Sequence, residues 1–135
     1  MASASFEDLR VYRIAEDLAD RIWDVAIRWD HFARDTVGKQ VVRSADSIGA
    51  NIAEGTGRGS YQDNRRFVRT ARGSLYETRH WLRRVYRRGL LTPDEVAALE
   101  PLIKELGPRL NAYLRSIGDH VRKAAPNETQ DARGQ

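Results

Sequence analysis

Apolar residues recur at alternating intervals of three and four along four segments of the 135-residue chain, and this spacing constrains the fold more than any other feature. Such spacing places apolar side chains on one face of an α-helix, whereas a half-buried strand would alternate apolar and polar residues. The four apolar seams are Val11, Ala15, Leu18, Ile22, Val25 and Trp29; Val37, Val41, Ile48 and Ile52; Val68, Ala71, Leu75, Thr78, Leu82 and Val85; and Val96, Leu99, Ile103, Leu106, Leu110, Tyr113 and Ile117. The sequence therefore predicts four amphipathic helices.

Short connections join these helices, so neighbours along the chain are expected to run antiparallel. The expected helices cover about residues 6–29, 35–54, 61–88 and 92–118. This order predicts an all-α domain, an up-down-up-down antiparallel four-helix bundle over residues 6–118. We expect a flexible N-terminus over residues 1–5 and a polar, disordered tail over residues 119–135. The alternative, an array of helical hairpins, would require an internal repeat that the sequence lacks.

Glycine, proline and hydroxyl-bearing residues predict where the helices begin and end. Ser60 is the expected N-cap of the third helix and Gly89 its stop. Thr92 precedes a proline and has a glutamate three residues later, which is the pattern of a capping box. Pro101 and Pro108 interrupt the apolar pattern of the fourth helix, so we expect a kink or a short break there.

The chain contains no cysteine, which excludes disulfide bonds, thiolate metal sites and a cysteine nucleophile. No apolar run approaches the roughly 20 residues that span a bilayer. The first ten residues lack the basic and apolar regions of a secretory signal. We expect a cytoplasmic protein that does not associate with membranes.

No group of residues indicates catalysis. The glycines at positions 55, 57 and 59 are interpreted as a helix stop and turn, because they follow a helix and lack the lysine of a P-loop. Glu77 and His80 have the ligand spacing of a di-iron bundle, but the second such pair is missing. We therefore expect no catalytic residue, no metal and no cofactor, and a protein that is not an enzyme.

Positive charge is concentrated in the third helix. The chain carries a net charge of +4, yet ten arginines lie between Gly57 and Gly89 with only Asp63 and Glu77 as acidic residues. At about 100° per residue, seven residues share one narrow stripe beside the apolar face. The stripe consists of Arg65, Arg69, Arg72, Tyr76, Arg79, Arg83 and Arg87. Guanidinium groups interleaved with an aromatic ring favour contacts to phosphates and stacking on bases.

Two other interpretations of the stripe remain open. It forms either a solvated helix face or a contact with the acidic first helix of a neighbouring subunit. Intrahelical pairing cannot neutralise the third helix, because its acidic residues are too few. The acidic residues of the first helix are Glu16, Asp17, Asp20 and Asp24.

Polar residues border the apolar faces of the second and third helices. They are Arg43, Ser47, Asn51 and Glu54 on the second helix, and Ser74 and Glu77 on the third. Polar groups near a core need hydrogen-bond partners, so we expect a structural network that sets the register of the two helices. A ligand site is the alternative, because carboxylates with shifted pKa values also gather at functional sites.

The second and third helices also carry motifs of a known family. Residues 47–55 read SIGANIAEG and residues 73–77 read GSLYE, and the opening residues 6–12 read FEDLRVY. These motifs resemble those of the small 23S rRNA-intervening-sequence proteins, the S23-type four-helix bundle family, over about residues 6–117. Gly49 departs from the pattern, because family members often carry proline there.

The resemblance implies a four-helix bundle that assembles as a homopentamer. A related branch comprises the accessory variability determinant proteins of diversity-generating retroelements, which are basic pentamers that bind nucleic acid and work with a reverse transcriptase. The family name records where some of the genes lie and does not imply a ribosomal protein. We therefore expect a non-enzymatic oligomeric bundle that binds RNA or DNA, largely without sequence preference, through its basic third-helix face. The alternative is a protein–protein interaction module whose arginines pair with a neighbouring subunit or an acidic protein such as a reverse transcriptase.

Overall fold

The computed structural model describes the backbone of residues 5–134 and the side chains of residues 5–123. Within this range the chain forms four long helices and three short helical segments. The long helices are α1 (Arg10–Ala26), α3 (Lys39–Thr56), α4 (Tyr61–Arg87) and α5 (Pro93–Gly134). The short segments are the 3-10 turn η1 (Phe6–Asp8), α2 (His31–Ala33) and the π-helical η2 (Arg34–Gly38).

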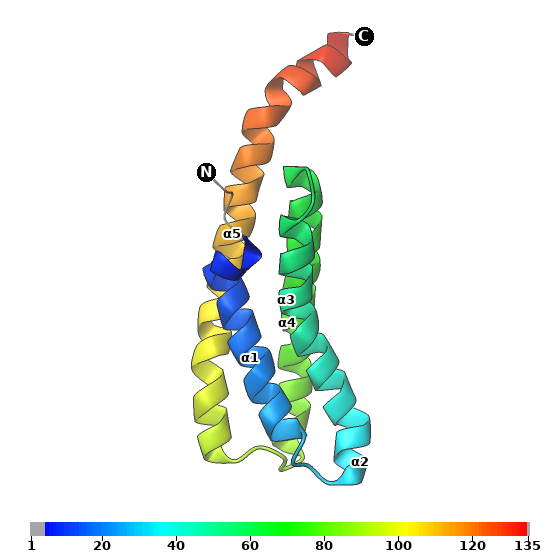
Figure 1. Cartoon of the computed structure of the whole chain (residues 1–135), viewed down its shortest axis with the longest axis vertical. Coiled ribbons are helices and arrows are strands. Elements are labelled where there is room, and N and C mark those ends of the chain that lie inside the picture. The colour runs from blue at the N-terminus through cyan, green and yellow to red at the C-terminus, as the bar shows by residue number, and fades with distance from the viewer. Residues whose placement is uncertain (1–4, 135) are drawn as a thin grey trace.

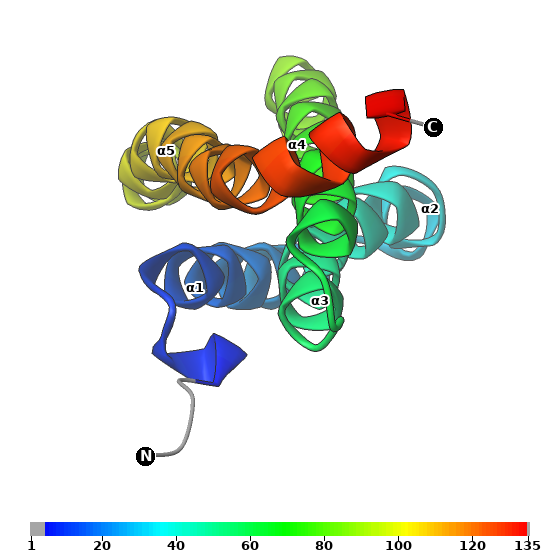
Figure 2. The same cartoon turned by 90° about the horizontal axis from the view of Figure 1, so that it is seen from above.

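The long helices form the predicted up-down-up-down bundle. Each packs against the next, and α5 returns to pack against α1. Seen from above, α1, α3, α4 and α5 stand at the corners of a square, with α1 diagonally opposite α4 (Figure 2). The all-α fold is confirmed, and the described part of the chain contains no strand.

The core consists of the residues that the apolar spacing picks out. Every seam residue of the predicted third helix is buried, including the hydroxyl-bearing Thr78. The exceptions elsewhere lie near helix ends or on α5 and are only partly buried. They are Trp29, Val96, Ile103 and Tyr113. Periodicity alone therefore identifies the face that each helix buries.

The predicted caps are present at both helix starts. Ser60 Oγ accepts a hydrogen bond from the Asp63 amide at 3.1 Å. Thr92 Oγ1 accepts from the Glu95 amide at 3.1 Å, and Glu95 Oε1 accepts from the Thr92 amide at 2.8 Å, which completes a reciprocal capping box. Gly89 ends α4 at a φ of 72°, a left-handed conformation that favours glycine.

The first predicted helix is shorter than expected, and the second begins earlier. α1 ends at Ala26, and the chain then turns so that Trp29 Nε1 donates to the backbone oxygen of Leu90 at 2.9 Å. Asp30 caps the next segment by accepting from the Ala33 amide at 2.9 Å. The bond from Trp29 joins residues far apart in the sequence, so local spacing could not reveal this end of α1.

The break that the sequence predicts in the fourth helix is absent. α5 is continuous through Pro101 and Pro108, and both prolines are exposed. A proline leaves the carbonyl four residues earlier without its helical partner. Those carbonyls belong to Ala97 and Lys104, which are exposed and therefore open to water.

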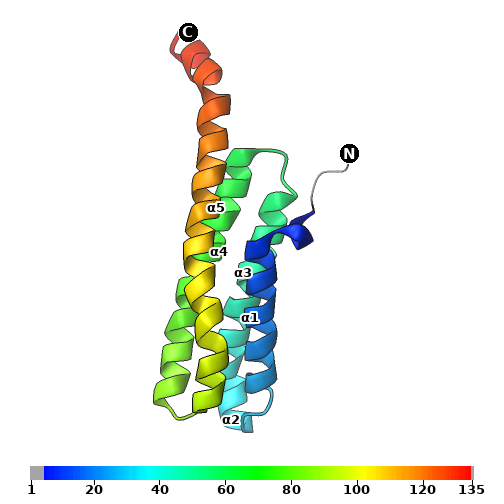
Figure 3. The ribbon, with the colours of Figure 1, turned by 90° about the vertical axis from the view of Figure 1, so that its left-hand side faces the viewer.

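α5 also continues past the predicted end of the bundle. It runs to Gly134 and extends beyond the other helices, so residues 119–134 prolong α5 where the sequence predicts a disordered tail (Figures 1 and 3). His120 stacks on the ring of Tyr61 at 4.7 Å between centroids, and Val121 packs against the core, so the first turn of this stretch is anchored to the bundle. Extension from packed turns needs no new helix nucleus. Residues 1–4 of the predicted flexible N-terminus, and Gln135, lie outside the described residues. Within the described chain, none of the helices combines the length and apolar character that a membrane crossing requires.

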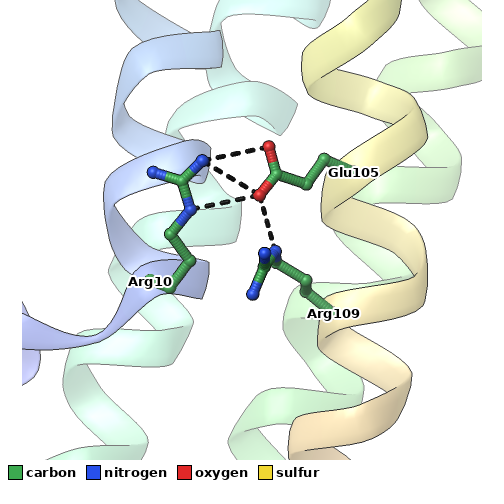
Figure 4. Close-up of polar contacts among 3 residues, drawn as sticks. All are labelled: Arg10, Glu105 and Arg109. Atoms are coloured by element: carbon green, nitrogen blue, oxygen red, sulfur yellow. Dashed lines mark hydrogen bonds and ion pairs between the residues drawn. The ribbon is translucent and has the colours of Figure 1, made fainter.

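An ion-pair cluster joins α1 to α5. Both oxygens of Glu105 accept from the guanidinium of Arg10 at 2.9–3.1 Å, and Arg109 Nε donates to Glu105 Oε2 at 2.6 Å (Figure 4). The hydrogen bonds from Arg10 hold the pKa of Glu105 below its ordinary value. This contact closes the ring of four helices on the side away from α3 and α4.

Candidate nucleic-acid interface

The predicted stripe lies along the side of α4 that borders α5. We call Arg65, Arg69, Arg72, Tyr76, Arg79, Arg83 and Arg87 the arginine stripe. Arg72 Nη1 donates to Asn111 Oδ1 of α5 at 3.1 Å, which places the middle of the stripe at the seam between the two helices. Arg79 and Arg83 line a groove with residues of α5. The stripe therefore follows the α4–α5 seam on the outside of the bundle.

Most stripe arginines point into solvent. Arg69, Arg79, Arg83 and Arg87 are exposed, and Arg65 and Arg72 are partly buried. From Arg65 to Arg87 the stripe is about 33 Å long at roughly 1.5 Å per residue. At about 3.4 Å per nucleotide, this length matches roughly ten nucleotides of one strand in a duplex.

Among the side chains that the structure describes, no acid pairs with the positive charge of the stripe. Among the side chains described, Asp63 pairs with Arg66 at 3.2 Å, and Glu77 accepts from the indole of Trp81 at 3.1 Å. These two acids are therefore engaged outside the stripe. No stripe arginine forms an ion pair with a side chain of residues 5–123. Such a surface attracts anions at long range.

Two tyrosines stand beside these arginines. The ring of Tyr76 is 53% exposed, and the guanidinium carbon of Arg79 lies 5.9 Å from its centroid. Tyr86 is 59% exposed at the edge of the stripe. Exposed rings beside cations provide surfaces on which bases stack.

The acids of α1 do not face the stripe. α1 stands diagonally across the bundle from α4 (Figure 2). Asp17 pairs with Arg21 at 3.1 Å, and Glu16 accepts from the hydroxyl of Tyr12 at 3.0 Å. Burial, together with the neighbouring Asp20, raises the pKa of Asp46 on α3. Glu16, Asp20 and Asp46 line one groove between α1 and α3, on the side of the bundle opposite the stripe, and we call these three residues the acidic side.

The structure brings together three of the six residues predicted to form the polar network. Ser47 and Ser74 share a hydrogen bond of 2.9 Å between their hydroxyls. Asn51 Nδ2 donates to the Ser47 backbone oxygen at 2.8 Å and to its hydroxyl at 3.0 Å. Thr78 Oγ1 donates to Ser44 Oγ at 2.9 Å, and both residues are buried. Sequence reasoning missed this second pair, although each member lies three or four residues from Ser47 or Ser74.

The other three predicted members bond elsewhere. Arg43 donates to Gln40 at 2.8 Å, Glu54 accepts from Arg58 at 3.1 Å, and Glu77 accepts from Trp81. All three are exposed and find partners within four residues along the chain, so they do not bridge α3 and α4. The network is therefore small, uncharged and structural.

Gly55 belongs to the helix contact rather than to a helix stop, because α3 continues to Thr56. A Cβ atom at position 55 would lie 2.7 Å from Asn64 Oδ1 and 2.9 Å from Phe67 Cβ. The absence of a side chain allows α3 and α4 to approach closely at their connected ends.

The E-x-x-H pair of α4 does not gather further ligands. Glu77 bonds to Trp81, and the ring of His80 packs edge-on against Trp81 at 4.7 Å between centroids. In the part of the chain that the structure describes, no three His, Cys, Asp or Glu side chains are grouped so that they could hold a metal ion.

Comparisons with known proteins agree with this architecture. A solved structure from Bacteroides thetaiotaomicron VPI-5482, a protein of unknown function from the S23 ribosomal protein family, superposes with a TM-score of 0.68. It is 24% identical and covers 77% of this chain and 97% of its own, so the likeness shows the fold. No curated protein matches the chain in sequence. The sequence profile of the 23S rRNA-intervening sequence proteins matches residues 7–112, and the chain therefore belongs to that family.

Proposed function

We propose that this protein is a non-enzymatic, cytoplasmic, homo-oligomeric bundle that binds RNA or DNA through the arginine stripe. The observation that supports it is the row of arginines on α4 without an acidic partner among the side chains described. Binding of this kind draws its affinity from the release of counterions, so it depends weakly on base sequence and steeply on salt.

Assembly would multiply the effect of one stripe. The family resemblance implies a homopentamer, in which several stripes act on one strand. Linked sites bind one polymer more tightly than a single site does, provided that the polymer reaches them together. Because α1 and α4 are diagonally opposed, a stripe on the outside of each subunit is available either to a polyanion or to the next subunit.

A titration at two ionic strengths tests the proposal. A labelled oligonucleotide is bound to the intact oligomer at about 50 and 200 mM salt, between which a protein with six phosphate contacts loses roughly a thousandfold in affinity. We expect binding at low salt and a steep loss at high salt. Absence of binding at low salt, or affinity that salt leaves unchanged, would overturn the proposal.

A second candidate function follows from the acidic side formed by α1 and α3. The stripe would then pair with those acids on a neighbouring subunit, or with an acidic protein partner such as a reverse transcriptase. Replacing Arg69, Arg79 and Arg83 by glutamine separates the two functions. Dissociation of the oligomer, measured by light scattering, would assign the stripe to a subunit interface, whereas an intact oligomer with weakened binding supports nucleic acid.

A further inference from the structure

A groove opens between α4 and α5 at one end of the arginine stripe. Its volume is about 360 Å³, toward the lower end of the roughly 300–1,000 Å³ of small-molecule sites. The residues that line it include Arg79, Arg83 and Tyr86 of α4 and Val96, Leu99 and Ile103 of α5. Seen from above, the C-terminal end of α4 tilts outward from the bundle (Figure 2). This tilt accounts for an opening in the seam.

The floor of the groove is made of core residues that the bundle leaves incompletely covered. Val96 and Ile103 belong to the apolar seam of α5 but are only partly buried. Further along the same seam, Leu106 and Leu110 are fully buried. The groove thus offers the apolar surface of Val96 and Ile103, the two seam residues on either side of the buried Leu99.

The walls of the groove are cationic and aromatic. Arg79 and Arg83 are exposed, and neither forms an ion pair with a side chain of residues 5–123. The exposed ring of Tyr86 stands at the mouth. On the α5 side, Lys104 neutralises Glu100 at 3.1 Å. A ligand that matches both the apolar floor and the cationic walls has an apolar ring with negative charges directly beside it.

We propose that this groove receives an unpaired base of a nucleic acid whose phosphates contact Arg79 and Arg83, so that the protein prefers single strands to duplexes. The proposal rests on the proposed function of the stripe. A duplex keeps its bases stacked inside and presents only phosphates and groove edges, so it cannot enter an apolar opening without unstacking. A single strand places a ring in the groove at no such cost, and stacking tolerates any base.

An acidic amphipathic helix is the competing occupant, and the groove favours the base. A helical peptide needs an apolar track over successive turns, read at positions three, four and seven residues apart. Here the apolar opening is confined to one end of a stripe about 33 Å long. Along the rest of the stripe, the residues beside the arginines are buried core, such as Val68 and Leu75.

The test compares a labelled single strand of about twelve thymidines with its duplex, using the intact oligomer at one salt concentration. We expect the single strand to bind about tenfold more tightly, since one stacked base contributes on that order. Val96→Trp fills the groove, and Tyr86→Ala removes the ring at its mouth. Each should lower single-strand affinity about tenfold and leave duplex affinity unchanged. Val42→Trp, in an apolar groove between α1 and α3, is the matched control and should change neither.

The outcomes distinguish failure of the base site from failure of the proposed function on which it rests. Failure of the wild type to bind either nucleic acid contradicts the proposed function itself. Equal binding of strand and duplex, or Val96→Trp and Tyr86→Ala variants that bind the single strand normally, overturns the base site and leaves the stripe intact. Tight binding of a polyglutamate peptide that Val96→Trp abolishes would assign the groove to an acidic peptide and overturn the base site as well.

Discussion

Gly55 shows how one residue can determine the separation of two helices. Any Cβ atom there would meet Asn64 and Phe67 within 3 Å. Gly55→Ala should therefore destabilise the protein by about 1–3 kcal/mol, because the rigid contact cannot absorb an added methyl group. Urea unfolding of the two proteins measures this difference.

Gly73 provides the control for that prediction. It also lies inside a helix, but a Cβ atom there would meet nothing within 4 Å. Gly73→Ala should raise stability by about 0.5–1 kcal/mol through helix propensity alone. Equal effects of the two substitutions would show that helix contact does not determine the role of Gly55.

Glu105 links stability to pH at the α1–α5 seam. Hydrogen bonding from Arg10 lowers its pKa from an ordinary value near 4.5, so the folded state favours the carboxylate. The resulting stabilisation is fully present above pH 4.5 and is lost as the pH falls through the lower folded-state pKa. We expect Glu105→Gln to lower the melting temperature at neutral pH, with the gap to wild type closing in acid.

Thermal melts at several pH values check that prediction. Glu100→Gln is the matched control, because its partner Lys104 lies on the same helix and the pair is exposed. Isolated surface pairs of this kind contribute only about 0.3–0.5 kcal/mol, so little change is expected. A Glu105→Gln deficit that persists unchanged into acid would contradict the role of its charge.

At the scale of the helix, α5 continues through two prolines at which the sequence predicts a kink or a short break. Pro101 lies in the helix interior, is exposed, and costs roughly 3 kcal/mol relative to alanine in such a position. Pro101→Ala should therefore stabilise the bundle by about 1–3 kcal/mol, as measured by denaturant unfolding. Unchanged or lower stability would mean that α5 does not run unbroken through this position.

The sequence predicts helix faces better than helix ends. Burial follows the three-four spacing because the bundle places one face of every helix inward, so Leu75 and Leu106 could be assigned without a structure. The end of α1 depends on the bond between Trp29 and the backbone of Leu90, a contact that forms only once the chain has folded. Local patterns carry no information on such a pairing.

The candidate site, like the fold, could be predicted from the sequence only in part. The angular spacing of the arginine stripe could be read from the sequence, because helix geometry alone places Arg69, Arg79 and Arg83 together. Half of the predicted polar network is present, since Glu54 and Glu77 instead bond to partners four residues further along the chain. The groove beside Tyr86 depends on the tilt of α4 against α5, which periodicity does not encode.

At the scale of the whole molecule, the bundle has a basic side and an acidic side that face away from each other. The basic side follows the α4–α5 seam, and the acidic side lies at α1 and α3, so the described acids of one subunit do not pair with its own stripe. A polyanion, or the acidic side of a neighbouring subunit, would supply negative charge by displacing the counterions that otherwise screen the stripe. The central claim is that a nucleic acid does so.

The most direct test is the salt dependence of binding by a stripe variant and a matched variant. Arg69, Arg79 and Arg83 are replaced by glutamine in one protein, and Arg13, Arg21 and Arg28 of the α1 region in the other, so that both lose the same charge. For a single strand, the slope of log affinity against log salt should become shallower by about 2 in the stripe variant, at roughly 0.7 per lost phosphate contact. The α1 variant should keep the wild-type slope. Equal slopes in the two variants, with both oligomers intact, would contradict the assignment of nucleic-acid binding to the arginine stripe.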